Sequence, residues 1–150
     1  MRGYALLIMG LLVPLLSSMA TAQENNPFYG KVIPMDEKMF REKVFDYESH
    51  SDSLWRYAGD KPAIIDFYAD WCAPCRLTGS ILKGLAREYE DSIYIFKVNV
   101  DSEPALARHY GISTIPALLF VPLAGKPTLR VGGDDRATYR RLIEELLLKE

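Results

Sequence analysis

The only two cysteines of this chain are separated by two residues, in the stretch Trp71-Cys72-Ala73-Pro74-Cys75. A disulfide that closes so short a loop restricts the unfolded chain little and stabilises a fold only weakly. Chemistry is the better explanation, because two thiols at this spacing can interconvert between a dithiol and a disulfide. We therefore interpret Cys72 and Cys75 as a redox pair.

Half of a zinc site is the alternative interpretation of such a pair. Zinc takes at least three protein ligands, and four in structural sites. The chain has no second pair of cysteines, and His50 and His109 lack convincing ligand spacing. We expect neither a metal nor another cofactor.

The residues around the pair predict a strand followed by a helix. Residues 63–69 form an almost uninterrupted apolar run, which is typical of a central strand buried on both faces. Leu77, Ile81 and Leu85 recur at four-residue spacing and predict a helix over residues 73–90. The redox pair therefore lies at the start of this helix.

The start of a helix suits a reactive cysteine, because its unpaired N–H groups and the positive end of its dipole stabilise a thiolate. Pro74 fits the first helical turn, where no N–H needs a partner. Cys75 lies one turn after Cys72, and we expect it to be the more buried of the two. Cys72 is thus predicted to attack disulfides and Cys75 to resolve the mixed disulfide.

Asp66 is the single carboxylate within the apolar run. Burial disfavours the charged form and should raise the pKa of Asp66 toward neutrality, so that Asp66 could exchange a proton with Cys75. Lys97, on the neighbouring predicted strand, is a candidate charge partner. The alternatives are that Asp66 faces an exposed edge of the sheet and that Lys97 is an ordinary surface lysine.

The rest of the chain alternates between predicted strands and helices. These further elements are a first strand at 39–45, a short helix at 51–57, a strand at 93–100, a helix at 104–110, strands at 117–121 and 127–131, and a closing helix with Tyr139, Leu142, Ile143, Leu146 and Leu147 on its apolar face. A turn at Gly125 joins the last two strands and predicts an antiparallel hairpin. We expect an α/β domain with a central mixed sheet of about five strands flanked by about four helices.

The first residues are predicted to be a targeting segment. Arg2 precedes an apolar run over 5–16, and residues 20–22 (Ala-Thr-Ala) match the small-x-small pattern of a signal-peptidase site. The run is shorter than the roughly 20 residues that span a bilayer. We predict a cleavable signal peptide at 1–22, an N-terminal arm at 23–38 and a domain at 39–150. The protein would then be periplasmic or secreted, without stable membrane insertion; the alternative is an anchor formed by an uncleaved N-terminal segment.

Composition and charge narrow the function classes. The 150 residues are 49% hydrophobic and 25% charged, which suits one soluble domain, and we expect a monomer. The net charge of −2 and the lack of a basic run argue against a nucleic-acid binder.

Three separated motifs resemble the thioredoxin family. They are Asp66-Phe67-Tyr68-Ala69-Asp70-Trp71-Cys72-Ala73-Pro74-Cys75, Lys97-Val98-Asn99-Val100-Asp101 and Gly111-Ile112-Ser113-Thr114-Ile115-Pro116. The resemblance runs from about Met39 to the C-terminus and implies a thioredoxin fold. It also implies a cis peptide bond between Ile115 and Pro116, beside the disulfide, and backbone hydrogen bonds from Ile115 to an extended substrate.

The resemblance further implies a substrate groove beside the pair. Its border would consist of Trp71, Ala73, Pro74, Ile115, Pro116 and Gly132. Alternatively, Gly132 and Gly133 form only a turn before the last helix.

Two residues depart from the family pattern. Ala73 replaces the usual glycine after the first cysteine, and Ser80 replaces the usual helix-kinking proline. We expect Ala73 to shift the reduction potential modestly and Ser80 to change the bend of the helix.

The direction of electron flow is predicted from two positions. Strong oxidants of the superfamily usually place His before the second cysteine, where this chain has Pro74, and Ile115 before Pro116 resembles reducing thioredoxins. We expect a protein-disulfide reductase that acts on disulfide-containing client proteins. An exported reductase needs electrons from across the membrane, so we infer a membrane thiol–disulfide donor. The alternatives are a disulfide oxidase or isomerase, and a non-catalytic interaction module of the same fold.

Overall fold

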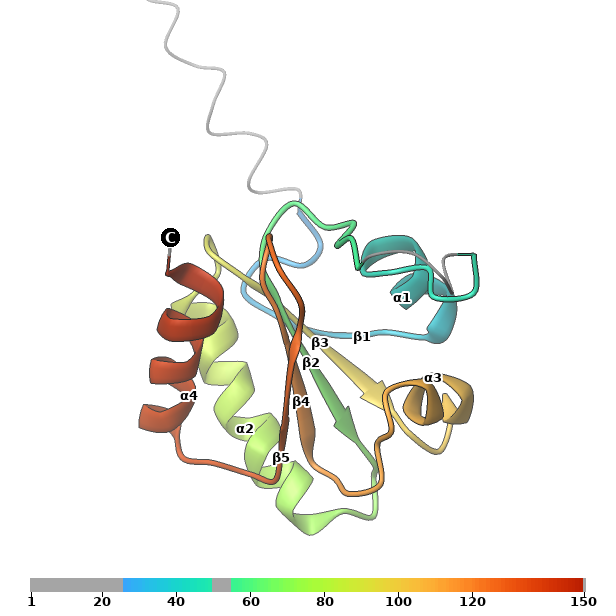
Figure 1. The fold of residues 1–150 in the computed structure, drawn as a ribbon. Coiled ribbons are helices and arrows are strands. Elements are labelled where there is room, and N and C mark those ends of the chain that lie inside the picture. Colours follow the sequence, from blue (N-terminus) through green and yellow to red (C-terminus); the bar gives the residue numbers. More distant parts are fainter. Residues whose placement is uncertain (1–25, 50–54, 150) are drawn as a thin grey trace, which may run out of the picture.

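The structure is a computed structural model that describes residues 26–49 and 55–149. Among these residues, five strands form one mixed sheet in the order β1-β3-β2-β4-β5 (Figure 1). The strands are β1 Val32–Pro34, β2 Ala63–Tyr68, β3 Tyr94–Asn99, β4 Ala117–Val121 and β5 Thr128–Val131. The first three run parallel to one another, whereas β4 is antiparallel to β2 and β5 is antiparallel to β4.

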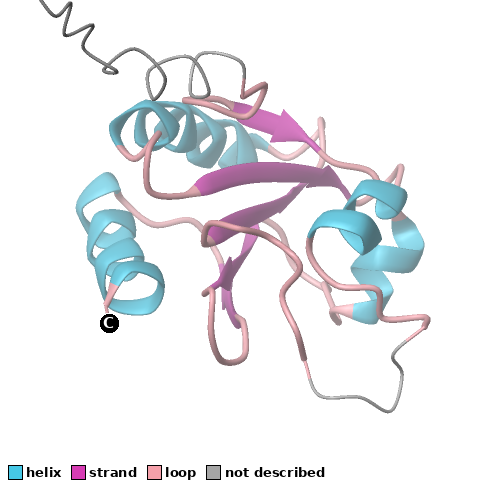
Figure 2. Ribbon diagram, turned by 90° about the horizontal axis from the view of Figure 1, so that it is seen from above, coloured by secondary structure: helices cyan, strands magenta, loops and turns pink. Residues whose placement is uncertain are grey.

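Helices cover both faces of the sheet. They are α1 Glu37–Lys43, α2 Ala73–Glu88, α3 Pro104–His109 and α4 Arg136–Ile143, which continues as a π-helical segment over Glu144–Leu148. In Figure 1, α2 and α4 lie on one face and α1 and α3 on the other, and Figure 2 shows the sheet between the two layers from above. The fold is the thioredoxin fold, as predicted.

The central strand β2 separates two hydrophobic cores. Ile65 and Phe67 pack in the core under α1 and α3 with Phe40, whereas Ile64 packs with Leu82 in the core under α2 and α4. Successive side chains of a strand point to opposite faces. Residue 66 therefore lies on the same face as Ile64, under α2.

The segment 39–45 is not a strand as predicted, because it belongs largely to α1. Asp36 caps this helix by accepting a hydrogen bond from the Met39 N–H at 2.7 Å. Phe40 and Val44, four residues apart, are both buried in one core. The apolar residues of this segment thus follow the helical period, with a capping residue just before them.

Two other predictions are corrected upstream of β2. The arm predicted at 23–38 contains β1, whose three residues pair with β3. Of the helix predicted at 51–57, residues 51–54 lie outside the described residues, and residues 55–57 are not helical. The predicted signal peptide at 1–22 also lies outside the described residues. Within the part of the chain that the structure describes, no helix has both the length and the apolar character needed to cross a membrane.

The remaining elements are confirmed with small shifts of their ends, but Leu77 is placed differently. This side chain is 69% exposed, whereas Leu82, Leu85 and Ala86 are the buried apolar residues of α2. Leu77 is therefore not part of the buried face of α2, although it shares the four-residue spacing of Ile81 and Leu85.

Candidate active site

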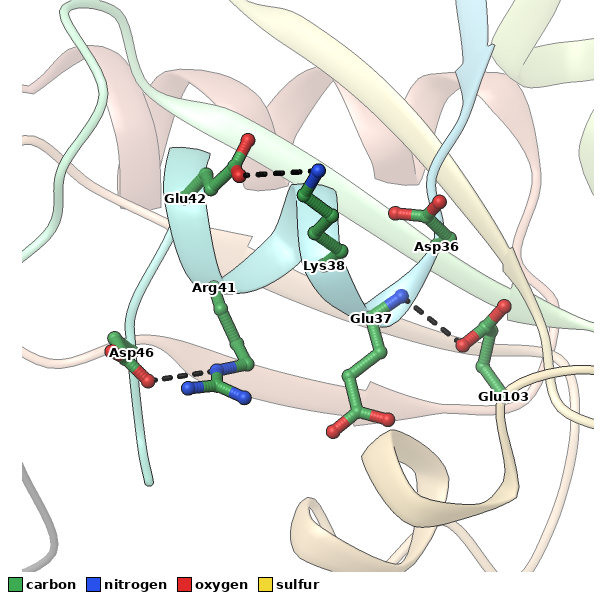
Figure 3. Close-up of a pocket in the computed structure, with 7 residues that line it drawn as sticks. All are labelled: Asp36, Glu37, Lys38, Arg41, Glu42, Asp46 and Glu103. Carbon is green, nitrogen blue, oxygen red and sulfur yellow. Dashed lines mark hydrogen bonds and ion pairs between the residues drawn. The ribbon is translucent and has the colours of Figure 1, made fainter. Parts of the chain in front are cut away.

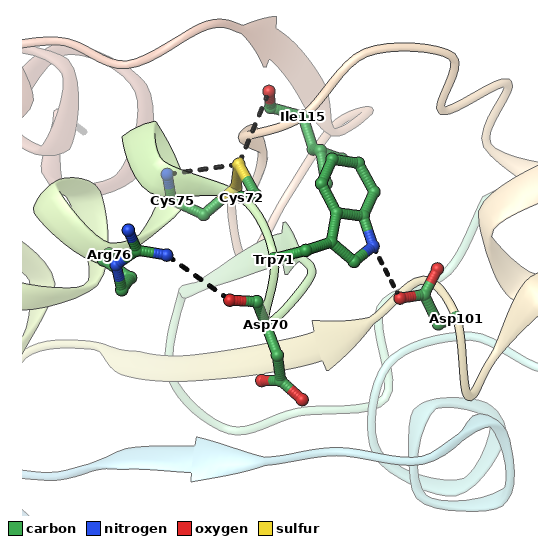
Figure 4. Close-up of a disulfide and its surroundings, with 7 residues drawn as sticks. All are labelled: Asp70, Trp71, Cys72, Cys75, Arg76, Asp101 and Ile115. Carbon is green, nitrogen blue, oxygen red and sulfur yellow. Dashed lines mark hydrogen bonds between the residues drawn. A yellow bond between two sulfur atoms is a disulfide. The ribbon is translucent and has the colours of Figure 1, made fainter.

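Cys72 and Cys75 form a disulfide at the amino end of α2, with their Cα atoms 5.3 Å apart (Figure 4). Cys72 is the N-cap residue, and its sulfur accepts a hydrogen bond from the Cys75 N–H at 3.3 Å. Ala73 and Pro74 form the exposed first turn between them. Because the amino end of a helix attracts negative charge, this position favours a Cys72 thiolate after reduction.

The two cysteines are equally buried, each 4% exposed, so the prediction that Cys75 is the more buried of them is wrong. Ile115 explains the burial of Cys72, because it packs against the pair and its carbonyl oxygen lies 4.0 Å from the Cys72 sulfur.

The loop before β4 faces the disulfide. The Ile115–Pro116 peptide bond is cis, as the resemblance implied, and Pro116 is buried. Gly132 donates its backbone N–H to the Pro116 carbonyl oxygen at 2.8 Å and has a φ of 96°, a conformation that favours glycine. Gly132 thus supports this loop directly and does more than form a turn before α4.

Trp71 projects beside the pair and is 70% exposed. Its indole N–H donates to a carboxylate oxygen of Asp101 at 2.9 Å (Figure 4). Asn99 accepts the Asp101 N–H at 2.9 Å and donates to Asp70 at 3.4 Å. Sequence reasoning assigned no role to Asp101 or Asn99. The signal was their place at the carboxyl end of β3, because the carboxyl ends of the parallel neighbours β2 and β3 lie side by side in the sheet.

Asp66 is only 3% exposed, which excludes the alternative of an exposed edge position. Burial raises its pKa to about 7, against an opposing effect of the Lys97 charge. No described protein atom hydrogen-bonds to its Oδ1. The raised pKa that the sequence predicted is therefore found, and it puts Asp66 in the range where a carboxyl group can both take up and release a proton near neutral pH.

Lys97 pairs in register with Asp66 across β2 and β3. Among the described residues it forms no ion pair with Asp66 within 4.0 Å; its ammonium lies over the ring of Tyr68, 5.2 Å from the centroid. Lys97 therefore acts on Asp66 through its charge and not through a direct contact.

A cavity of about 370 Å³ connects these groups. It is lined by Val32, Asp66, Tyr68, Ala69, Asp70, Cys75, Arg76, Gly79, Ser80, Lys83 and Lys97. Cys75, Asp66 and Lys97 thus share one space beneath α2, and Ser80 lies at its edge. The volume is enough for several water molecules, which could carry a proton between the carboxyl group and the thiol.

A larger hollow of about 830 Å³ lies beside α1 and shares no lining residue with this cavity (Figure 3). Its charged side chains interact within the cluster. Arg41 pairs with Asp46, and Glu103 accepts the Glu37 N–H at 3.1 Å. We assign this hollow no part in the redox chemistry.

The predicted lack of a metal rests on the chain's residue types. His109 stacks on Tyr47, with ring centroids 3.9 Å apart, and His50 lies outside the described residues. No three His, Cys, Asp or Glu side chains among residues 26–49 and 55–149 are grouped to hold a metal ion.

Comparison with known proteins agrees with this geometry. The thioredoxin family model matches residues 33–145. A thioredoxin of Borreliella burgdorferi is 40% identical over 113 residues, covering 75% of this chain and 95% of that protein. A chloroplastic M-type thioredoxin of Pisum sativum is 32% identical over 143 residues, covering 89% of this chain and 83% of that protein.

Among solved structures, chloroplastic thioredoxin z shares the fold. Its TM-score is 0.65 at 22% identity, and the match covers 77% of this chain and 94% of that one. From the family model and the relatives together, the chain belongs to the thioredoxin family and is a thiol–disulfide oxidoreductase.

Proposed function

We propose that this protein is an exported reductase of protein disulfides, which acts as a monomer by dithiol–disulfide exchange. The observation that carries the proposal is the placement of the pair. The Cys72 sulfur caps the amino end of α2, and Cys75 shares a cavity with the buried carboxyl group of Asp66.

The first step is attack by Cys72 on a client disulfide. The Cys72 thiolate, stabilised by the Cys75 N–H and the amino end of α2, forms a bond to one client sulfur. The client S–S bond breaks, and the other client sulfur leaves as a thiolate that takes up a proton. We expect the client to contact the residues predicted to border the groove, which are Trp71, Ala73, Pro74, Ile115, Pro116 and Gly132.

The second step releases the client. Cys75 transfers its proton to the Asp66 carboxylate, directly or through water in the shared cavity, and its thiolate attacks the Cys72 sulfur. The bond between Cys72 and the client sulfur breaks, and the client leaves reduced by two electrons. Cys72 and Cys75 are left as the disulfide that the structure contains.

The reducing direction is supported by Pro74 before the second cysteine and Ile115 before the cis proline. A reduction potential of about −270 mV, as in thioredoxin, is expected from equilibration with glutathione, whereas about −120 mV would indicate an oxidase. The protein should also accelerate insulin reduction by dithiothreitol. If it does so no better than Cys72→Ser, the interaction-module alternative stands instead.

Export is supported by the pattern of residues 1–22, and it implies a thiol–disulfide electron donor in the membrane. To test export, the full chain is expressed, the cells are fractionated and the protein in each fraction is analysed by mass spectrometry. We expect a periplasmic or secreted form that begins at Gln23. Recovery of the uncleaved chain in the membrane fraction would favour the anchored alternative.

Client proteins and the donor can be identified by trapping. Cys75→Ser removes the resolving thiol, so clients should accumulate as mixed disulfides on Cys72 that dithiothreitol releases. The matched control is Cys72→Ser with Cys75→Ser, which should retain none of them.

A further inference from the structure

The cavity under α2 runs from the protein surface to the buried end of the active site. At its inner end, Asp66, Ala69 and Cys75 are 3%, 1% and 4% exposed. Four lining residues are exposed: Asp70 and Arg76 beside the pair, and Ser80 and Lys83 farther along α2. The cavity therefore joins bulk solvent to the two groups between which the proton moves.

This entrance lies apart from the client side of the disulfide. None of the six residues assigned above to the client groove lines the cavity. Its walls come instead from α2, from the end of β2 and the two residues after it, and from β1 and β3 through Val32 and Lys97. A client bound over the groove would thus leave the cavity open.

Gly79 occupies the middle of the helical wall. Cys75, Gly79 and Lys83 are four residues apart on α2, so they lie on one face, and all three line the cavity. Helical side chains point back toward the preceding turn, which here carries Cys75. A Cβ added at Gly79 would meet no atom within 4 Å, so the space beside this lining residue is open to a side chain.

We propose that Gly79, because it has no side chain, keeps open a rear solvent entrance through which Asp66 and Cys75 exchange protons with water while a client covers the groove. The inference rests on the proposed proton role of Asp66. In the resolving step the Cys75 proton passes to the Asp66 carboxylate and then to water in the entrance. No bond forms or breaks at Gly79 itself, so Gly79 is a positioning residue.

The charged and titratable groups around Asp66 are consistent with proton release along this path. They are Lys97 on β3, Arg76 and Lys83 on α2, Asp70 after β2, and Tyr139 on α4, whose pKa is raised chiefly by burial and in small part by the Asp66 charge. Beside Asp66 on β4 lies Leu118, which is apolar. Of the three cations that line the cavity, Lys97 lowers the pKa of Asp66 and so favours the carboxylate once its proton has left.

Gly79→Leu tests the inference, with Gly79→Ala as its matched control. Leucine should fill the entrance and exclude water, whereas alanine leaves most of the volume free and improves helix propensity. Carbon-13 NMR titration of the Asp66 carboxyl group in the oxidised protein should give a pKa raised by about one unit in Gly79→Leu and unchanged in Gly79→Ala. Urea unfolding verifies that both variants fold, and Gly79→Met serves as a second filling variant.

Stopped-flow kinetics test whether the entrance is used. Resolution of a preformed mixed disulfide at pH 7 should slow in Gly79→Leu but not in Gly79→Ala, and the slowing should vanish in an Asp66→Asn background. The first attack, measured in a Cys75→Ser background, should be unchanged. If Gly79→Leu and Gly79→Met fold but leave the Asp66 pKa or the resolution rate unchanged, the proposed role of the entrance is wrong. The proposed reductase function would not be affected by that result. The reductase proposal would instead be refuted by a reduction potential of the wild-type protein near that of a disulfide oxidant.

Discussion

Replacement of Asp66 by asparagine should stabilise the oxidised protein, and the gain should grow as the pH rises. The side chain is 3% exposed, and burial raises its pKa from 3.8 to about 7. Between these values the folded protein keeps a proton that the unfolded chain releases. Folding stability from this group is therefore full below pH 3.8 and is lost as the pH rises to 7.

The size of the effect follows from the width of that window. About three pH units at 1.36 kcal/mol each correspond to about 4 kcal/mol of stability lost above pH 7. Asparagine has nearly the same shape and no charge, so Asp66→Asn does not lose this stability as the pH rises. The free energy of unfolding of Asp66→Asn minus that of the wild type should thus increase by about 4 kcal/mol between pH 4 and 9.

Urea unfolding of both oxidised proteins at several pH values measures this difference, and groups that titrate alike in both proteins cancel. Asp135→Ala is a control of opposite sign. Asp135 caps α4 by accepting the Thr138 N–H at 2.7 Å, which lowers its pKa. That variant should be less stable than the wild type at neutral pH, with a gap that closes as the pH falls below 4. A flat difference for Asp66→Asn from pH 4 to 9 would refute the raised pKa and, with it, the proton role.

Three further substitutions probe the fold and the site. Asp36→Ala removes the cap on the Met39 N–H and should lower the free energy of unfolding by about 1 kcal/mol in urea; no change would mean that α1 does not depend on its cap. Phe67→Ala, which leaves a hole in the core under α1 and α3, should cost about 3–5 kcal/mol in the same assay. Trp71→Phe keeps the ring but loses the hydrogen bond to Asp101, so insulin reduction should slow while the free energy of unfolding stays nearly constant; equal rates would show that Asp101 does not position the tryptophan for the reaction.

The elements nearest the site could be predicted because their signals are local. The apolar run of β2 is buried in the centre of the sheet, and the pair at 72–75 starts α2 with proline in the first turn. Upstream, β1 has only three residues and depends on pairing with β3, which no local pattern reveals. In α1, the apolar side chains around Phe40 suit a strand by type, and only their spacing and the cap at Asp36 favour a helix.

The parts of the site that could not be predicted depend on distances between separate elements. The register of β2 with β3 sets Lys97 beside Asp66, yet the ammonium lies over Tyr68. Burial of Cys72 depends on how the loop at Ile115 packs, and the cavity depends on the gap left between α2 and the sheet. Such features arise from packing, so residue types alone do not specify them.

The two edges of the sheet bear on the behaviour of the protein in concentrated solution. An exposed edge strand can pair with the edge of another molecule and start aggregation, and short strands, proline and charged residues oppose this. Here β1 has three residues and ends in Pro34, and β5 has four residues and carries Arg130. Neither edge offers a long template for intermolecular pairing. The molecule can therefore hold the exposed Trp71 ready for client proteins without extending its sheet from copy to copy.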